Sequence, residues 1–261
     1  MKIVIIGAGN VGYHLATALH ESQHEIVQIF SRSAARFSDL KHLQNTDFIT
    51  DLTSLNTTAD LYILAVSDTA IQIVSEQMPL LPHAIMTHTS GATSMQVLQR
   101  HKNYGIFYPL QTFTRHKKPN FSQIPFILDS NKKEWIEKLQ LVASFLSENI
   151  YFLNDSQRQT LHLAAVFANN FTNHILHISN DICEKNNVDF HILHPLIAET
   201  FEKIKYHSPA DIQTGPAKRH DEKTILAHLN LLSNQKIYSD VYELVSKSIQ
   251  KTYIHNFSNQ K

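Results

Sequence analysis

The sequence lacks the features that mark several protein classes. It contains one cysteine, Cys183, in 261 residues, which excludes an intrachain disulfide framework and a multi-cysteine zinc site and favours a protein of the reducing cytoplasm. The apolar run near the N-terminus, Ile3–Ile6, is too short for a signal peptide, and no run approaches the roughly 20 residues that cross a membrane. Lys and Arg total 23, as do Asp and Glu, so no excess of positive charge favours nucleic acid or anionic lipid.

Glycine is also scarce, and its placement is informative. Only six glycines are present, and three of them, Gly7, Gly9 and Gly12, fall within six residues. A chain that uses so little glycine is expected to need these three for backbone geometry.

Residues 1–153 are predicted to form a Rossmann-type domain, because short β-rich runs alternate with helical patterns. This alternation is typical of a doubly wound parallel sheet. Helices are predicted over 10–21, after Ser67-Asp68, and over 132–147. Strands are predicted over 2–6, 25–30, 47–50, 61–66, 84–88, 105–108, 124–128 and 151–153.

Residues 154–261 are predicted to form an all-α domain, since no strand pattern is found there. The run 155–184 contains no Gly or Pro and has helical apolar spacing. The pattern over 190–206 contains Pro195, where we expect a break or kink. Further helices are predicted over 221–233, with Asp221 as N-cap, and over 235–253. The boundary near residue 154 is a change of periodicity and not a flexible linker.

The strongest motif is the run from Gly7 to Gly12, GAGNVG, which has the pattern G-x-G-x-x-G. It follows a predicted strand and opens a predicted helix, as a dinucleotide-binding loop does. Gly7 permits the tight turn, Gly9 lets the backbone approach a pyrophosphate, and Gly12 lets helix and strand pack closely. Asn10 and Val11 begin the helix, whose free N–H groups favour phosphate. The alternative is a structural glycine turn in an unrelated α/β protein.

The end of the second strand indicates which dinucleotide is bound. An NAD site usually has Asp or Glu there, to accept from the ribose 2′-hydroxyl. This chain has Ser31-Arg32-Ser33, with no carboxylate before Asp39. Arg32 can pair with a 2′-phosphate, and both serines can donate to it. The sequence therefore predicts NADP(H). The alternative is a solvated Arg32 and a protein that accepts either cofactor.

At this point a family resemblance emerges, carried by the motifs GAGNVG, FSRS, AVSD, HTSGA, FYPLQTF, HLAAVFANNFTNHIL and TGPAKRHD. The chain resembles a bacterial family of Rossmann-like NADP oxidoreductases with a helical C-terminal domain of uncharacterised function. That family is similar to pyrroline-5-carboxylate reductases, deazaflavin-dependent NADP reductases and β-hydroxyacid dehydrogenases. The resemblance implies a Rossmann domain followed by an all-α domain of the 6-phosphogluconate-dehydrogenase type, in a dimeric NADP-dependent enzyme. It supplies no substrate.

Ligands of open α/β sheets bind beyond the carboxyl ends of the strands, which singles out two loops. Val66-Ser67-Asp68 and the loop from His88 to Gly91 are expected to flank the ribose and nicotinamide. His88 and Ser90 carry groups that could hold a carboxamide or a substrate oxygen. The alternatives are that Asp68 caps its helix and that His88 is a buried histidine bonded to backbone.

The long predicted helix from residue 155 supplies the candidate acid–base groups. At 100° per residue, one stripe that could line a cleft contains Arg158, His162, Val166, Asn169 and Asn173. His162 is the best candidate proton donor, and Asn169 and Asn170 could hold a carbonyl or carboxylate. The alternative is an ordinary solvated face.

The chain departs from the pattern of the β-hydroxyacid dehydrogenases in one respect. Those enzymes place a catalytic lysine on the equivalent helix, with an asparagine one turn on. This chain has no lysine between Lys138 and Lys185, which argues against lysine-assisted alcohol oxidation.

Two further segments could contact substrate. Gln111, after the strand ending near Tyr108, offers a donor and an acceptor, and Lys218 and Arg219 could bind a carboxylate or phosphate. A structural turn and a basic surface loop are the respective alternatives. The histidine pairs 174/177 and 191/194 have ligand spacing, but no third ligand completes a metal site, so none is predicted.

Two functions remain open. The first is an NADP(H)-dependent oxidoreductase that moves hydride between nicotinamide and a C=O or C=N carbon of a small molecule. The second is a non-catalytic NADP-binding sensor or scaffold, which the missing helix lysine keeps open.

The apolar positions in 161–178 and 192–201 exceed what one helix face can bury in a small domain, so we expect a homodimer through the C-terminal helices.

Overall fold

The computed structural model describes residues 1–22 and 24–253, and the chain divides into two compact units, Met1–Ala168 and Asn169–Lys261. The predicted change from sheet to helix at residue 154 therefore lies inside the first unit, and the limits of the two functional domains remain a prediction. The last eight residues of the predicted all-α domain, 254–261, lie outside the described residues.

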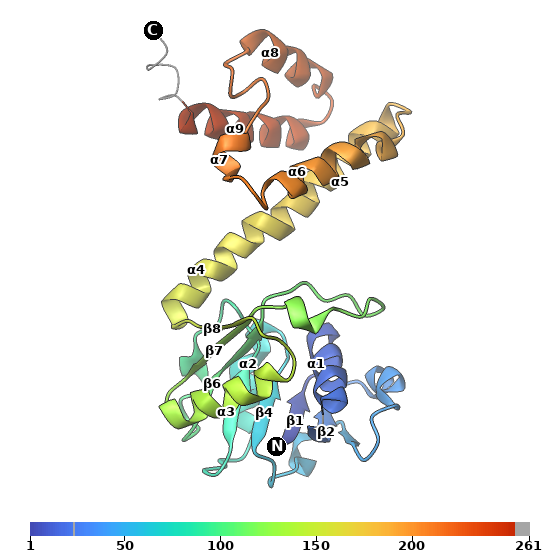
Figure 1. Ribbon diagram of the computed structural model, residues 1–261. Coiled ribbons are helices and arrows are strands. Elements are labelled where there is room, and N and C mark those ends of the chain that lie inside the picture. Colours follow the sequence, from blue (N-terminus) through green and yellow to red (C-terminus); the bar gives the residue numbers. More distant parts are fainter. Residues whose placement is uncertain (23, 254–261) are drawn as a thin grey trace. The chain divides into compact units, whose positions relative to one another are not determined.

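The first unit contains a mostly parallel sheet of eight strands, in the order β3-β2-β1-β4-β5-β6-β7-β8 (Figure 1). Its one antiparallel pair is β6–β7. This confirms the predicted Rossmann architecture, with strand ends moved by at most two residues. The strands are β1 (Lys2–Ile6), β2 (Glu25–Phe30), β3 (Asp47–Ile49), β4 (Leu61–Leu64), β5 (Ile85–His88), β6 (Tyr104–Pro109), β7 (Phe126–Ser130) and β8 (Ile150–Phe152).

Both faces of the sheet are covered, which explains why the central strands are continuously apolar. In β1, Ile3 and Ile5 join one buried cluster, while Val4 and Ile6 join another. The first cluster includes residues of α1 (Asn10–Glu21) and α3 (Lys133–Ser144). The second includes residues of α2 (Asp68–Gln77) and the 3₁₀ turn η3 (Met95–Leu98). Two further 3₁₀ segments, η1 (Ala34–Leu40) and η2 (Leu52–Ser54), follow β2 and β3.

The parallel strands place the candidate loops at one edge of the sheet. The chain leaves β1 at Gly7, β2 at Ser31, β4 at Ala65 and β5 at Thr89. The long connection between β6 and β7, residues 110–125, contains η4 (Phe121–Gln123) and is tied back to the start of α1.

The predicted helix over 155–184 forms in three parts. It opens with α4 (Asp155–Ala165), whose first turn is closed by a capping box between Asn154 and Gln157. A π-helical segment, Val166–Phe171, follows, and α5 (Thr172–Lys185) continues it. The spacing of 100° per residue that defined the predicted polar stripe does not hold across the π-helical segment.

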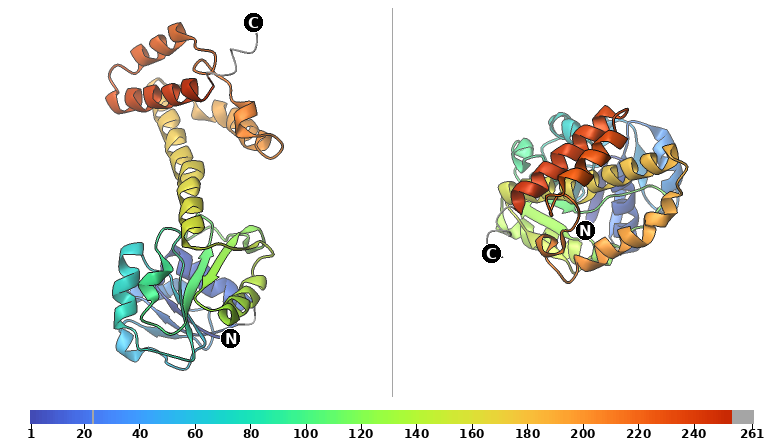
Figure 2. Two further views of the ribbon diagram at one scale, coloured as in Figure 1. Left: turned by 90° about the vertical axis from the view of Figure 1, so that its left-hand side faces the viewer. Right: turned by 90° about the horizontal axis from the view of Figure 1, so that it is seen from above.

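The second unit is all helical in its described part, residues 169–253 (yellow to red in Figures 1 and 2). Pro195 lies in the first turn of α6, where its missing N–H costs nothing, so it starts the helix instead of kinking it. Asp221 caps α8 by accepting from the Thr224 N–H, as predicted. Besides α5, the elements are η6 (Phe190–Leu193), α6 (His194–Lys203), α7 (Pro209–Ile212), α8 (Glu222–Leu231) and α9 (Lys236–Thr252).

This unit buries few apolar side chains. The helices are joined by polar contacts such as Tyr238 Oη donating to Asp181 (2.8 Å). Between α5 and α9 lies an apolar cavity of about 300 Å³. Within 169–253 the buried hydrophobic residues are Ile178, Ala217, Ile225 and Leu232.

Among the described residues, no helix is both long and apolar enough to cross a membrane.

Candidate cofactor and active site

The glycine loop has the geometry that its three glycines predict. Gly7 has φ +110°, and a Cβ there would lie 2.4 Å from the Ala65 carbonyl oxygen. A Cβ on Gly12 would lie 1.8 Å from the Gly7 carbonyl oxygen, so the first turn of α1 is packed directly on the loop. A Cβ on Gly9 would meet nothing within 4 Å. The loop thus leaves open space where a pyrophosphate would approach its backbone.

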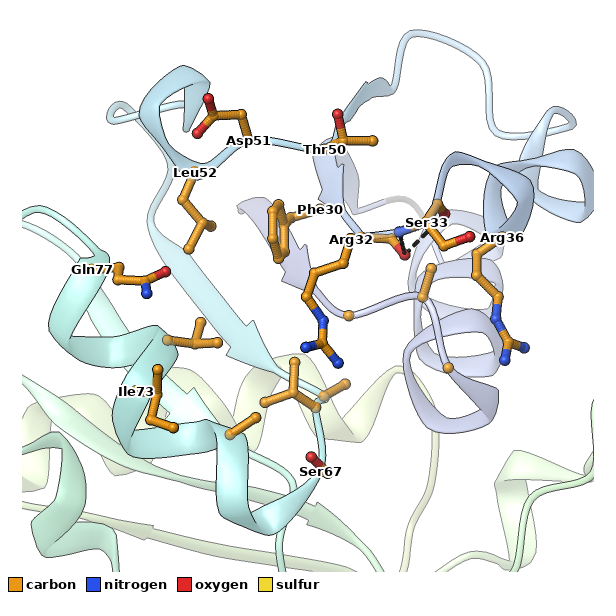
Figure 3. Close-up of a pocket in the computed structure, with 18 of the residues that line it drawn as sticks. Phe30, Arg32, Ser33, Arg36, Thr50, Asp51, Leu52, Ser67, Ile73 and Gln77 are labelled. Carbon is orange, nitrogen blue, oxygen red and sulfur yellow. Dashed lines mark hydrogen bonds between the residues drawn. The ribbon is translucent and has the colours of Figure 1, made fainter.

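A cavity of about 1080 Å³ lies over this loop (Figure 3). Of the predicted cofactor residues, seven line it: Gly7, Gly9, Ser31, Arg32, Ser33, Val66 and Ser67. Its other walls come from the end of β3 and from α2, including Asp51, Leu52, Ile73 and Gln77. A cavity of this size, between the ends of β1, β2 and β4, suits a dinucleotide.

Two arginines line the end of the cavity beside β2. Arg32 and Arg36 are both exposed, and Ser33 lies between them (Figure 3). Ser31 is buried, and its Oγ donates to the Ser33 carbonyl (3.1 Å) and accepts from the Ser33 N–H (3.3 Å). Ser31 therefore shapes the turn, and Arg32 and Arg36 supply its positive charge.

The other predicted cofactor residues do not line this cavity. Asn10 donates from its side-chain amide to the Phe113 carbonyl (2.9 Å). Val11 packs against the core, and Gly12 is buried. Asp68 is the first residue of α2, in the first turn, where a carboxylate stabilises a helix. The N-cap is Ser67, and no side chain of the described residues caps this N-terminus, so the alternative that Asp68 caps its helix is wrong.

His88 is a structural histidine. It is completely buried; its Nδ1 accepts from the Ser90 N–H (3.1 Å), and its Nε2 faces the Ser94 carbonyl (3.4 Å). Burial, together with the nearby Arg158 charge, lowers the pKa of His88 to about 4. These contacts therefore favour the alternative of a buried strand-end histidine bonded to backbone, and the cofactor contact of His88 stays a prediction.

Ser90 is likewise used by its own loop. Its Oγ accepts from the Ala92 and Thr93 N–H groups (3.1 and 2.9 Å) and donates to Thr93 Oγ1 (3.0 Å). A side chain so occupied builds the loop and has little capacity left for a substrate.

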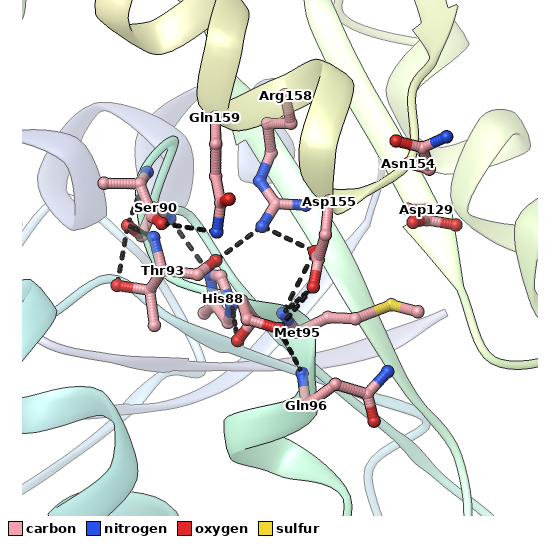
Figure 4. A network of polar contacts seen from close by, with 12 residues as sticks. His88, Ser90, Thr93, Met95, Gln96, Asp129, Asn154, Asp155, Arg158 and Gln159 are labelled. Carbon is pink, nitrogen blue, oxygen red and sulfur yellow. Dashed lines mark hydrogen bonds and ion pairs between the residues drawn. The ribbon is translucent and has the colours of Figure 1, made fainter.

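Hydrogen bonds from this loop to Asp155 and Arg158 clamp it to α4, and these two side chains also form an ion pair within the helix (Figure 4). Asp155 pairs with buried Arg158 (2.7 Å) and accepts from Ser94 Oγ and the Met95 N–H. Arg158 donates in turn to the Thr93 carbonyl. Burial opposes ionisation of Asp155, but these hydrogen bonds together lower the pKa of its carboxyl.

His162 lies one turn after Arg158, against the same loop. Its Nδ1 is 3.3 Å from Tyr108 Oη, at the end of β6. A Cβ on Gly91 would lie 2.6 Å from this Nδ1 and 2.8 Å from Tyr108 Oη, so only glycine fits there. Burial and the Asp68 carboxylate raise the pKa of Tyr108, which therefore stays protonated at neutral pH.

The remaining predicted site residues are Gln111 in the first unit and Asn169, Asn170, Lys218 and Arg219 in the second. Gln111 is exposed, and its Oε1 accepts from the Thr112 N–H (2.8 Å). Asn169 and Asn170 are exposed in the π-helical segment, and Lys218 donates to the Gln213 carbonyl (2.7 Å) in the second unit, next to Arg219. These roles remain predictions.

Within the described residues, no three His, Cys, Asp or Glu side chains gather as metal ligands would.

Two family models match the chain. A Rossmann-like domain matches residues 1–112, and a domain of unknown function, DUF2520, matches residues 124–249. A crystal structure of a candidate NADP oxidoreductase from Bacteroides fragilis is 38% identical, with a TM-score of 0.88, and the match covers 96% of this chain and 98% of that one. The chain belongs to the family of Rossmann-like proteins with a DUF2520 domain. No curated protein matches it.

More distant structures share the fold of this family member. An imine reductase from Myxococcus stipitatus in complex with NADP⁺ is 15% identical, with a TM-score of 0.67, over 96% of this chain and 93% of that one. A 1-pyrroline-5-carboxylate reductase from Streptococcus pyogenes is 15% identical, with a TM-score of 0.64, over 96% and 98%.

Some residues of the site were not predicted. Arg36 follows Arg32 by four residues, a spacing that could have indicated a second phosphate ligand. Arg158 was predicted only as part of the polar stripe, and its ion pair with Asp155 was not predicted, although their i,i+3 spacing is typical of one. Arg115 was not predicted either, because it donates to the carbonyls of Ala8 and Arg36, which are far from it in the sequence.

The glycine loop generates a matched pair of variants. We expect Gly9→Ala to weaken NADPH binding at least tenfold without changing the melting temperature, because its Cβ meets only the space of the cavity. Gly12→Ala should cost about 1–3 kcal/mol of stability, since its Cβ overlaps a backbone oxygen. Calorimetric titration and thermal unfolding measure both. Unchanged NADPH affinity in Gly9→Ala would mean that the loop is structural only.

Buried His88 generates a pH dependence. Its folded pKa of about 4 lies below the unfolded value of about 6.5, so the unfolded chain binds the proton first as pH falls. The free energy of unfolding should therefore fall between pH 6.5 and 4, by about 3 kcal/mol from this group. Denaturant unfolding of His88→Gln, which keeps a donor and an acceptor, should show a flatter profile. Parallel profiles for the two proteins would contradict the assignment.

Proposed function

We propose that this family member is an NADP(H)-dependent oxidoreductase acting on a C=O or C=N carbon of a small molecule. The observation that carries the proposal is the cavity in which Gly9 faces open space and Arg32 and Arg36 line the end of β2. The 38% identity to a protein named as a candidate NADP oxidoreductase supports it. The single cysteine supports a reducing, cytoplasmic setting.

Different residues of the cavity would hold different parts of the cofactor. The Gly7–Gly9 backbone and the N-terminus of α1 would hold the pyrophosphate, and Arg32, Ser33 and Arg36 the 2′-phosphate. Leu52, Ile73 and Val74 offer apolar surface in the same cavity. When bound, NADPH supplies a hydride from its nicotinamide ring.

His162 is the acid–base group that the site offers. It is half-buried on α4, and its Nδ1 lies within hydrogen-bonding distance of Tyr108 Oη. Histidine can gain or lose a proton near neutral pH, as reduction of C=O or C=N requires. The Asp155–Arg158 clamp holds α4 to the loop after β5, which fixes the position of His162.

The helical unit supports a homodimer. Its described residues bury four hydrophobic side chains and leave thirteen large ones exposed, more than a folded unit of this length leaves in water. We propose that a second copy covers them. The exposed residues are Phe171, Ile175, Val188, Ile192, Leu196, Phe201, Ile204, Tyr206, Leu226, Leu231, Ile237, Leu244 and Val245.

Cofactor choice depends on Arg32. Arg32→Ala should cost NADPH binding about 1.5–3 kcal/mol, the value of one charge-assisted pair, while NADH binding stays nearly unchanged. Lys41→Ala is the control, because this exposed cation follows η1 and does not line the cavity. Calorimetry with both cofactors measures the difference. Equal losses for NADPH and NADH would rule out the 2′-phosphate contact.

Catalysis is expected to depend on His162. With deuterium-labelled NADPH and a panel of cyclic imines and ketones, His162→Ala should lower kcat about 100-fold and leave the Kd for NADPH within twofold. Tyr108→Phe should have a smaller effect, and His83→Ala, an exposed histidine before β5, should have none. Unchanged kcat in His162→Ala would remove it as proton donor. Tight NADPH binding without any turnover by the wild type would favour the sensor instead.

The assembly has its own test. Light scattering at micromolar concentration should give twice the chain mass, and Leu196→Glu with Leu244→Glu should lower it to one chain mass. Glu199→Lys, on an already polar position of α6, is the control. A wild-type mass of one chain with cooperative unfolding would show that the apolar faces are buried without a second copy.

A further inference from the structure

Arg115 lies in the connection between β6 and β7 and forms hydrogen bonds with two other segments, η1 and the glycine loop. Its Nε donates to Asp39 Oδ2 (2.9 Å), its Nη1 to the Ala8 carbonyl (3.1 Å) and its Nη2 to the Arg36 carbonyl (3.1 Å). The guanidinium also stacks on the Tyr13 ring, 4.0 Å from its centroid. Only 12% of the side chain is exposed. Every nitrogen of the guanidinium is thus used, in the fixed fork that lysine cannot reproduce.

The loop that carries Arg115 is itself anchored. The side-chain amide of Asn10 donates to the Phe113 carbonyl, and the His14 Nε2 lies 2.9 Å from the Thr114 carbonyl. Phe113 packs against the core cluster that contains α1. Arg115 therefore projects from a backbone that two side chains of α1 hold.

The three contacts connect two walls of the cofactor cavity. Ala8 is the middle residue of the glycine loop, and Arg36 belongs to η1, the segment that carries the second cavity arginine. Arg115 itself does not line the cavity. Holding the carbonyls of Ala8 and Arg36 with one planar group fixes the distance between the pyrophosphate wall and the 2′-phosphate wall.

Arg115 also neutralises Asp39, a carboxylate that lies near the predicted phosphate ligands in the sequence. Asp39 is the first carboxylate after Arg32, and its hydrogen bond to Arg115 lowers the pKa of its carboxyl, so it stays ionised. Without its partner, this negative charge would oppose a 2′-phosphate, which carries up to two negative charges.

We infer that Arg115 is a positioning residue for cofactor choice, which favours NADPH over NADH without touching the phosphate. The inference rests on the proposed function, since it needs the cavity to bind NADPH. It differs from the role of Arg32, because Arg115 acts on the backbone of η1 and on the charge of Asp39. The chemistry that it supports is recognition of a phosphate monoester on the adenine ribose.

The test is the ratio of NADPH to NADH affinity in Arg115 variants, measured by calorimetric titration. Arg115→Met should weaken NADPH binding at least tenfold and NADH binding less than threefold. Arg115→Lys should fall between, since an ammonium can pair with Asp39 but cannot hold both carbonyls. Lys118→Met is the control: it removes an exposed ion pair with Glu21 from the same loop and should change neither affinity more than twofold.

A second variant separates charge from geometry. Asp39→Asn added to Arg115→Met should recover part of the lost NADPH affinity if the uncompensated carboxylate contributes, and Asp39→Asn alone should keep the preference for NADPH. If Arg115→Met does not fold, the proposal stays testable, because the NADPH and NADH affinities of Arg115→Lys and Asp39→Asn can then be compared.

The outcomes distinguish this inference from the proposed function. Wild-type protein without affinity for NADPH would overturn both. Wild type that prefers NADPH, with equal losses of NADPH and NADH in Arg115→Met and Arg115→Lys, would overturn the inference alone. Unchanged affinities in both variants would also overturn it.

Discussion

The site depends on one steric constraint, the direct contact between the backbones of Gly12 and Gly7. With no room for a methyl group between them, α1 begins directly after the Gly7–Gly9 loop that follows β1. A Cβ on Gly7 would in turn lie 2.4 Å from the carbonyl oxygen of Ala65, just after β4. Three segments therefore converge on one point, and the cavity forms around it.

A second set of constraints is polar and acts on the loop after β5. Side-chain hydrogen bonds hold this loop, whereas close backbone packing holds the glycine loop. The side chains are those of His88, Ser90, Asp155 and Arg158. Two nitrogens of Arg158, Nε and Nη1, are buried without a hydrogen-bond partner in the described part of the chain. Burying such a guanidinium group costs free energy. This cost is consistent with a role of Arg158 in positioning the loop, and not only in stabilising the fold.

Local patterns in the sequence predicted much of this structure. The alternation of strands and helices, the three glycine roles and the Asp221 cap all depend on neighbours within a few residues, so they could be read directly. His88 could not, because a strand-end histidine looks the same in a sequence whether it faces a ligand or the core. Arg115 could not either, since its partners come from distant segments. The π-helical segment has no residue pattern that separates it from α-helix.

The shared hydrogen bonds of the Asp155 clamp have a consequence for local opening. The loop that contains Thr93, Ser94 and Met95 cannot move away without breaking its contacts with the first turn of α4. Asp155 accepts hydrogen bonds from Ser94 and Met95, and Arg158 donates one to Thr93. Loop and helix start therefore form one cooperative unit that opens together. Their amide hydrogens should exchange with solvent at a common free energy, although β6, β7, α3 and β8 separate the two segments along the chain.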